Sequence, residues 1–483
     1  MARQVRRSPR TKKTKRAERA AGTKTPPAPR ARPAQDPFAL ETEVGIFPTF
    51  FLAGFECSTF VWKDKKRKDY VALTGHDRHL EDDYGLLEEL GIGVVREAVR
   101  WPLVDQGRGR YDWSTVDPIV AALNDCHLTA IWDLMHYGFP DDFDPFSGAD
   151  QRRYVDYCRA VAEYLVPRRP APHYFTPLNE ITFFTAACTD MGWMYPFAKG
   201  KYAEMKQALC KMTIQGVKAI REVDPAARMV HVDPIVHAVP PEDRPDLADE
   251  AWKQAYEEAY EAWDMLAGKL HPELGGAPEI LDVVGVNVYH FSQAQLNEDK
   301  SREVLGPRDP RRKPLGEMLQ FAWERYHRPI VIGETSGYQD KRAEWLTMTM
   351  EESMRALNSG IDLQGICLYP CVDIPDWNSG EPALIGIYDL KDTDSCERVP
   401  CEAYIKELRR WQKILDHPES VEPDALERGG LGTVQLAEVR QHAKEWEKRT
   451  PGRQTVRGER RSPRAQKAGG ERRSPGAKKA GAR

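Results

Sequence analysis

Two glutamates at the ends of apolar runs are the residues of this chain best suited to chemistry. Glu180 ends the run Tyr174-Phe-Thr-Pro-Leu-Asn-Glu180, and Glu334 ends the run Pro329-Ile-Val-Ile-Gly-Glu334. A carboxylate at the carboxyl end of a buried strand points into the mouth of a sheet, where burial can shift its pKa. Paired carboxylates that face each other across a substrate are the machinery of glycoside hydrolysis. The hypothesis is that strands of one barrel bring both groups together.

The elements that must position these glutamates alternate along the chain from about residue 47 to about residue 415. Short apolar runs predict the strands Phe51–Ser58, Gly93–Val99, Thr129–Met135, Tyr174–Leu178, Met229–Asp233, Val283–Tyr289, Ile330–Gly333 and Gly365–Tyr369. Segments of helical period between and after them predict the helices Glu81–Leu90, Val116–Asp125, Gln151–Val166, Tyr202–Val223, Ala251–Leu270, Arg312–Tyr326, Ala343–Asn358 and Cys401–Ile414.

Strands and helices that alternate in one continuous block predict an α/β fold, a (β/α)8 TIM barrel. A doubly wound open sheet is the alternative, and it requires a glycine-rich phosphate-binding turn after the first strand. Gly54 alone does not make such a turn. The barrel is therefore the prediction.

Polar and aromatic side chains gather at the predicted carboxyl ends of the strands, where a barrel places its chemistry. Besides the two glutamates they are Arg96, His136, Asn179, Asn287, Tyr289, Tyr369, Asp376 and Trp377. Amides, an imidazole, carboxylates and aromatic rings suit a sugar, which offers hydroxyls for hydrogen bonds and an apolar face for stacking. These residues are the predicted substrate-binding set.

Several members of this set also have a plain structural interpretation. Arg96 neutralises acids at the barrel rim, His136 is a hydrogen-bonded core histidine, Asn179 caps a loop, Tyr369 and Trp377 are packing aromatics, and Asp376 is a turn residue. The joint occurrence in this order favours the functional interpretation over the structural one.

The order of the segments resembles the family 1 glycoside hydrolases, the β-glucosidase family, within clan A of the retaining glycosidases. The segments that carry the resemblance are Arg96-Glu-Ala-Val-Arg-Trp101-Pro102, His136-Tyr137 with Pro140, Thr176-Pro-Leu-Asn179-Glu180, Gly285-Val-Asn287-Val-Tyr289, Ile332-Gly-Glu334, Asp373-Ile-Pro-Asp376-Trp377 and Leu384-Ile-Gly-Ile-Tyr-Asp389. The resemblance spans roughly residues 47 to 415 and omits both ends of the chain.

The resemblance implies a catalytic role for each glutamate. Glu334 is the expected nucleophile, and Glu180 is the expected general acid and later base, in a double displacement that retains configuration. Arg96 and the Tyr289 hydroxyl are expected to stabilise the Glu334 carboxylate, and Asn179 to bind the sugar 2-hydroxyl. No metal or other cofactor is implied.

The chain departs from the family pattern at several sugar-reading positions. The first strand has no Gln, and Glu56 or Thr59 takes its place. Tyr369 replaces a Trp, Asp376 replaces a Glu, and Ile181 follows the acid/base glutamate where the family has Pro. A Ser-x-x-Lys-x-Tyr motif of phospho-sugar members is not found, which disfavours a 6-phosphoglycoside. The reaction type is therefore better supported than the substrate.

Composition sets the remaining expectations for this chain of 483 residues, with net charge −4 and nine cysteines. Residues 1–44 and 449–483 are predicted disordered basic tails, 45–416 the barrel and 417–448 a helical extension. Cysteines without paired spacing favour a reducing, cytoplasmic setting, with an organelle transit peptide as the alternative. No apolar run is long enough to predict a membrane helix.

The expected partner is a small-molecule or oligosaccharide β-glycoside, and the number of subunits is left open. One rival interpretation is a transglycosidase that uses the same two glutamates, and another is a non-catalytic carbohydrate-binding barrel. A third is a binder of nucleic acid or another anionic polymer through the Arg- and Lys-rich tails. Those tails lack interleaved aromatic residues, so they predict weak, non-specific contact at most.

Overall fold

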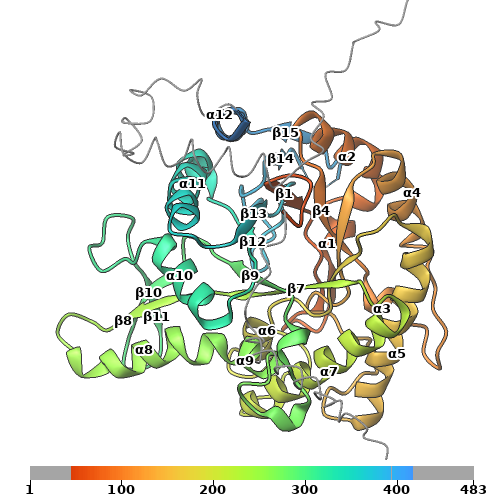
Figure 1. The fold of residues 1–483 in the computed structure, drawn as a ribbon, viewed down its shortest axis with the longest axis horizontal. Helices are drawn as coiled ribbons and strands as arrows, with labels where there is room; N and C mark the ends of the chain where they lie inside the picture. The colour runs from red at the N-terminus through yellow and green to blue at the C-terminus, as the bar shows by residue number, and fades with distance from the viewer. Residues whose placement is uncertain (1–44, 393, 417–483) are drawn as a thin grey trace, which may run out of the picture.

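The computed structural model describes residues 45–392 and 394–416. The predicted tails 1–44 and 449–483 and the predicted helical extension 417–448 lie outside the described residues. In the described part, long helices surround the strands (Figure 1).

Eight parallel strands close into a barrel in which neighbours along the chain are neighbours in space. They are β1 (Phe51–Gly54), β4 (Val94–Ala98), β5 (Thr129–Asp133), β6 (Tyr174–Thr176), β7 (Arg228–Pro234), β9 (Val283–Asn287), β12 (Ile330–Thr335) and β13 (Leu363–Leu368). The barrel closes where β13 pairs with β1, with Phe51 beside Ile366. The (β/α)8 prediction and all eight predicted strands are confirmed.

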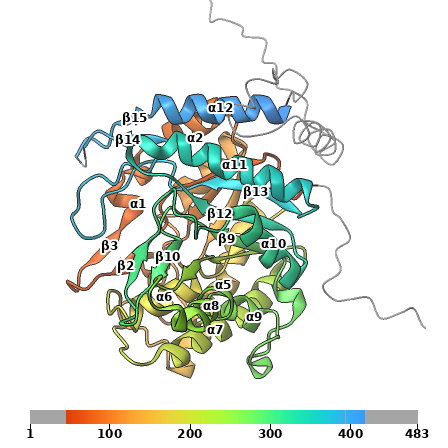
Figure 2. The ribbon, with the colours of Figure 1, turned by 90° about the vertical axis from the view of Figure 1, so that its left-hand side faces the viewer.

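Seven of the predicted helices are present with ends shifted by a few residues. They are α2 (Leu80–Glu89), α4 (Asp117–Asp125), α5 (Gly148–Leu165), α7 (Tyr202–Val223), α10 (Leu315–Tyr326), α11 (Arg342–Asn358) and α12 (Glu402–Asp416). Helix α7 shows why the pattern is readable, because Met205, Leu209, Thr213 and Val217 recur every fourth residue and are all buried. Helix α12 lies over α11 and α2 in Figure 2.

The predicted continuous helix Ala251–Leu270 is wrong. The chain instead forms α8 (Ala248–Tyr256), a 3₁₀ turn (Glu258–Tyr260) and α9 (Glu261–Leu266). Tyr256 belongs to a small outer cluster, whereas Trp263 is buried in the main core. The 3₁₀ turn breaks the helix between Tyr256 and Trp263, and these two rings pack in different clusters.

Short elements that the apolar pattern does not predict are inserted after barrel strands. The hairpin of β2 (Thr59–Val61) and β3 (Arg67–Asp69) follows β1, and helix α6 (Ile181–Cys188) follows β6. A three-stranded sheet joins β8 (His237–Val239), β10 (Gln293–Leu296) and β11 (Arg302–Val304), and it projects beside the barrel in Figure 1. These insertions all belong to loops at the carboxyl ends of strands, the face that carries function in a barrel.

The barrel interior is a packed core. Its cluster includes Leu52, Val94, Ile131, Val230 and Val331, one from each of five strands. Ile46 and Phe47 belong to the same cluster. A filled interior leaves the carboxyl ends of the strands as the place for chemistry. Among the described residues, no helix combines the length and apolarity that crossing a membrane requires.

Candidate active site

A buried arginine organises the carboxyl end of the barrel. Arg96 of β4 donates from Nη1 to Glu334 Oε1 at 2.7 Å and to the Gly333 carbonyl at 3.1 Å. Its Nη2 donates to Asp133 Oδ2 at 2.5 Å and to Asn179 Oδ1 at 2.8 Å. One guanidinium therefore ties together the ends of β4, β5 and β12 and the segment after β6.

Glu334 at the end of β12 is held on both oxygens. Oε1 accepts from Arg96, and Oε2 accepts from the Tyr289 hydroxyl at 2.8 Å. Hydrogen bonds of this kind, one of them from a charged donor, fix the orientation of the Glu334 carboxylate. The structure therefore places Arg96 and Tyr289 where the sequence expects the stabilisers of a nucleophile.

Glu180 sits in a different environment from Glu334. Its Oε1 accepts from Asn287 Nδ2 at 2.8 Å and its Oε2 accepts from the Tyr137 hydroxyl, with no cation in contact among the described residues. Burial, followed by the negative charge of Glu334, raises the pKa of Glu180 to about 8. A carboxyl whose pKa is raised in this way can act as a proton donor near neutral pH.

Asn179 is fixed by groups on both sides of its amide. Its oxygen accepts from Arg96, and its Nδ2 lies 2.9 Å from His136 Nε2 and 3.1 Å from the Tyr137 hydroxyl. His136 Nδ1 in turn lies 3.2 Å from Asp133 Oδ2. Asn179 and His136 are thus preorganised rather than free to rotate, as a ligand-binding shell requires.

Glu56, two residues after the end of β1, is the candidate from this part of the chain that reaches the site. Its carboxylate lies 3.8 Å from His136 Nε2 and accepts from the Ser58 amide at 3.1 Å. Burial raises the pKa of Glu56 against the opposing effect of His136. Thr59 instead pairs through its backbone, accepting from Arg67 and donating to the His136 carbonyl. Of Glu56 and Thr59, Glu56 is thus the one whose side chain lies beside the site, and a sugar-binding role for it stays a prediction.

The eighth-strand residues occupy the other side of the site. The Tyr369 ring lies 5.1 Å from the Arg96 guanidinium, and its hydroxyl accepts from the Cys57 amide at 3.1 Å. Trp377 is half-buried among aromatic rings, with its centroid 4.9 Å from Phe60. The Asp376 carboxylate caps its own turn by accepting from the Ser379 amide at 2.8 Å. The contacts of Asp376 are thus those of a turn residue, and sugar binding by it stays a prediction.

Two functional side chains were not predicted from the sequence. Asp133 anchors Arg96 and His136, and the signal for it is an acid inside the apolar strand Thr129–Asp133. Tyr137 contacts both Glu180 and Asn179 from a left-handed backbone with φ of 63°. A backbone conformation of that kind cannot be read from residue types alone.

A cluster of Cys57, Asp133 and His136 has the proximity of a metal site but not the chemistry. The three side chains each offer a ligand atom within 4.8 Å of the others. Burial raises the pKa of the Cys57 thiol well above its ordinary value, and Asp133 is already paired with Arg96. Asp133 also pairs with His136, and Cys57 Sγ donates to the Phe55 carbonyl at 3.0 Å, so these donor atoms are already engaged within the protein.

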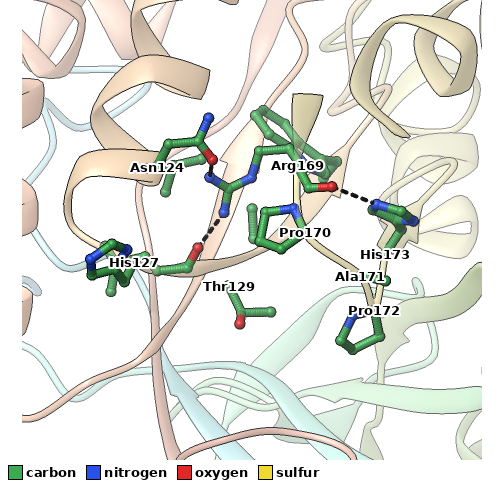
Figure 3. Close-up of a pocket in the computed structure, with 12 residues that line it drawn as sticks. Asn124, His127, Thr129, Arg169, Pro170, Ala171, Pro172 and His173 are labelled. Atoms are coloured by element: carbon green, nitrogen blue, oxygen red, sulfur yellow. Dashed lines mark hydrogen bonds between the residues drawn. The ribbon is translucent and has the colours of Figure 1, made fainter. Parts of the chain in front are cut away.

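A separate cavity of about 120 Å³ lies at the opposite, amino-terminal end of the strands (Figure 3). Thr129 at the start of β5 and His173 just before β6 line it. Arg169 donates there to the Asn124 side chain and to the Leu128 carbonyl, which joins two loops. The residues that line this cavity include no carboxylate, so the paired-carboxylate chemistry belongs to the other end.

Comparison with known proteins agrees with this architecture. The chain is 21% identical over 397 residues to the aryl-phospho-β-D-glucosidase BglC of Bacillus subtilis, covering 66% of this chain and 82% of that protein. It is 20% identical over 414 residues to a 6-phospho-β-galactosidase of Staphylococcus aureus, covering 69% and 87%. No family model matches the chain.

Solved structures share the fold at low sequence identity. A β-glucosidase from Thermotoga maritima in complex with castanospermine superposes with a TM-score of 0.61 at 16% identity, covering 76% of this chain and 98% of that one. A family 1 β-glucosidase from the same organism gives 0.58 at 18% identity, covering 70% and 87%. The resemblance is therefore confirmed: the chain is similar in sequence to phospho-β-glycosidases and shares its fold with family 1 β-glucosidases.

Proposed function

We propose that this chain is a retaining glycoside hydrolase that cleaves a β-glycosidic bond by double displacement. The observation that supports this most is the contrast between two buried glutamates. Glu334 accepts hydrogen bonds from Arg96 and Tyr289, whereas burial and the Glu334 charge raise the pKa of Glu180 to about 8. Two carboxyls whose environments differ in this way are an acid and a nucleophile.

In the first step, Glu334 attacks the anomeric carbon and the bond to the leaving oxygen breaks. Glu180 transfers its proton to that oxygen, so the aglycon leaves as a neutral alcohol. Arg96 and Tyr289 orient Glu334 for attack before the substrate arrives. The product of this step is a covalent glycosyl-enzyme.

In the second step, formation of the ester removes the negative charge of Glu334. Because that charge is a cause of the raised pKa of Glu180, the pKa falls and Glu180 now accepts a proton. A water molecule, deprotonated by Glu180, attacks the anomeric carbon and releases the sugar with its original configuration. Asn179 is the group expected to bind the sugar 2-hydroxyl.

The glycon is a neutral sugar in this proposal. Glu56 adds a buried carboxylate beside His136, and a negative group disfavours an anionic substituent nearby. His136 and Glu56 supply hydrogen-bonding groups, and the half-buried Trp377 supplies a ring for stacking. The sequence-based expectation of a reducing, cytoplasmic setting remains part of this proposal.

A panel of aryl β-glycosides tests the proposal on the wild type and on Glu334→Gln. Gluco, galacto, fuco, manno and xylo forms are compared with their 6-phosphorylated counterparts where these exist. The expected result is turnover of a neutral β-glycoside, release of the β-anomer seen by NMR, and loss of at least about 10³-fold in the variant. An α-anomer as first product, or comparable turnover in Glu334→Gln, contradicts the mechanism.

A further inference from the structure

The backbone at Glu180 has an unfavourable conformation. Its φ of 49° and ψ of 62° place a residue with a large side chain in the left-handed region. Such a conformation costs on the order of 1–3 kcal/mol and persists only where the surroundings hold it. Glu180 also lies between strand β6 and helix α6. The strained backbone is therefore that of the residue whose carboxyl must be oriented toward the site.

The neighbouring strand β7 holds this junction from both sides of Glu180. The Val232 carbonyl accepts from the Glu180 amide at 3.0 Å. The Asp233 carboxylate accepts from the Thr182 amide with both oxygens at 3.1 Å, and from the Thr182 hydroxyl at 2.8 Å. Two consecutive residues of β7 therefore bind the backbone amides of Glu180 and of Thr182, two positions further on.

The Asp233 contacts take the place of a local helix cap. Helix α6 has Glu180 as its N-cap residue, and the Glu180 side chain makes no capping hydrogen bond. An aspartate from another strand serves the first turn instead, and Asp233 is 2% exposed. Burial raises the pKa of Asp233 to about 7 against the lowering contacts of Thr182. A buried carboxyl would not be kept at this position without a compensating role.

We propose that Asp233 is a positioning residue for Glu180, holding the first turn of α6 so that the Glu180 carboxyl faces the site. This inference rests on the proposed role of Glu180 as general acid and base. Asp233 itself touches no reacting atom. Its removal misaims the proton donor and leaves the Glu334 nucleophile, Arg96 and Tyr289 in place.

The test compares two substrates that differ in their need for a proton. A 2,4-dinitrophenyl β-glycoside leaves without protonation, whereas a phenyl or methyl β-glycoside requires it. Asp233→Ala should lower kcat/KM for the poor leaving group by about 10²-fold and for the good one by less than about fivefold. Asp233→Asn keeps an oxygen for the Thr182 amide and should recover most of the lost rate.

Ser147→Ala is the matched control, because Ser147 caps α5 by accepting from the Asp150 amide away from the site. It should lower the melting temperature and leave the ratio of the two substrates unchanged. Glu180→Ala, measured in parallel, should show the same preference for the good leaving group and recover rate with azide.

The outcomes separate the inference from the proposed function. If Glu180→Ala shows no leaving-group preference, the acid/base assignment fails. If Glu180→Ala shows it and Asp233→Ala slows both substrates equally, as a purely structural cap does, the positioning role is overturned. If Asp233→Ala is insoluble, Asp233→Asn and Thr182→Val take its place. Each should steepen the leaving-group dependence by a smaller factor than Asp233→Ala. An unchanged dependence in both variants also overturns the positioning role.

Discussion

The hydroxyl of Tyr137 should set the upper pH limit of activity. It donates to Glu180 Oε2, and this contact lowers the pKa of Glu180 against the larger effects of burial and of Glu334. Tyr137→Phe removes the donor and keeps the ring, which packs on Phe183 at 5.3 Å. Loss of this donor destabilises the ionised form of Glu180 relative to the protonated form, so the pKa of Glu180 must rise further.

The size of the change follows from the kind of hydrogen bond that is lost. A bond to a charged acceptor contributes about 1.5–3 kcal/mol, and one pKa unit corresponds to about 1.4 kcal/mol. The pKa of Glu180, about 8 in the wild type, should therefore rise by about one to two units in the variant. Asn287 still donates to Oε1 at 2.8 Å, so the carboxyl keeps its place.

The assay is kcat/KM against pH for an aryl β-glycoside with a poor leaving group, because its falling alkaline limb reports the acid of the free enzyme. Tyr157→Phe is the control. Tyr157 is equally buried, and its hydroxyl donates to the Leu134 carbonyl at 2.8 Å. The control should lose stability and keep the limb near pH 8. A Tyr137→Phe limb that stays in place or moves to lower pH refutes the reasoning.

Three further predictions concern other buried charges. Arg96→Met strands the carboxylates of Asp133 and Glu334, so urea titration should show a loss of about 3–5 kcal/mol in the free energy of unfolding; a loss below about 1 kcal/mol contradicts it. Glu56→Gln should make KM less dependent on pH in the acidic range, because the Glu56 carboxyl titrates and the glutamine amide does not. Wild-type and variant plots of KM against pH that superimpose would rule this out. Burial opposes a charged His76, but the carboxylates of Glu97 and Asp83 prevail and raise its pKa from 6.5 to about 9. Its contribution of about 3 kcal/mol is present below pH 6.5 and lost as pH rises through 9, so His76→Gln should abolish that alkaline loss in unfolding experiments.

The sequence predicts the barrel well because parallel strands are buried on both faces. Strand β12 is buried along its whole length, and the run Ile330-Val-Ile stands out against amphipathic helices on either side. The inserted strands give no such signal. Strand β3 consists of Arg67, Lys68 and Asp69, and strand β11 is exposed at all three positions. A prediction that relies on runs of apolar residues therefore does not detect them. Their pairing is decided by the loops that carry them.

The residue types of the site, and through the family resemblance the contacts of Arg96 and Tyr289 with Glu334, were predictable, whereas the contacts of Glu180 were not. Glu180 and Glu334 each end an apolar run, and nothing in those runs distinguishes an acid from a nucleophile. The distinction arises because Arg96, 238 positions before Glu334 in the chain, turns toward that carboxylate, whereas Asn287 and Tyr137 turn toward Glu180. Strand order fixes which neighbours each carboxyl meets, and the register of β12 against β9 puts Glu334 beside Asn287.

The same reasoning explains why the sequence did not predict a role for Asp233, although its contacts in the structure indicate one. It ends the predicted strand Met229–Asp233 like the other site residues, yet its carboxylate turns sideways to Thr182 and not toward Glu334. A strand end therefore marks a residue as near the site without saying whether it acts on the substrate or on another residue. Leaving-group dependence separates a group that orients the acid from one that only stabilises the fold, since loss of the orienting group must lower the rate mainly where the acid is needed.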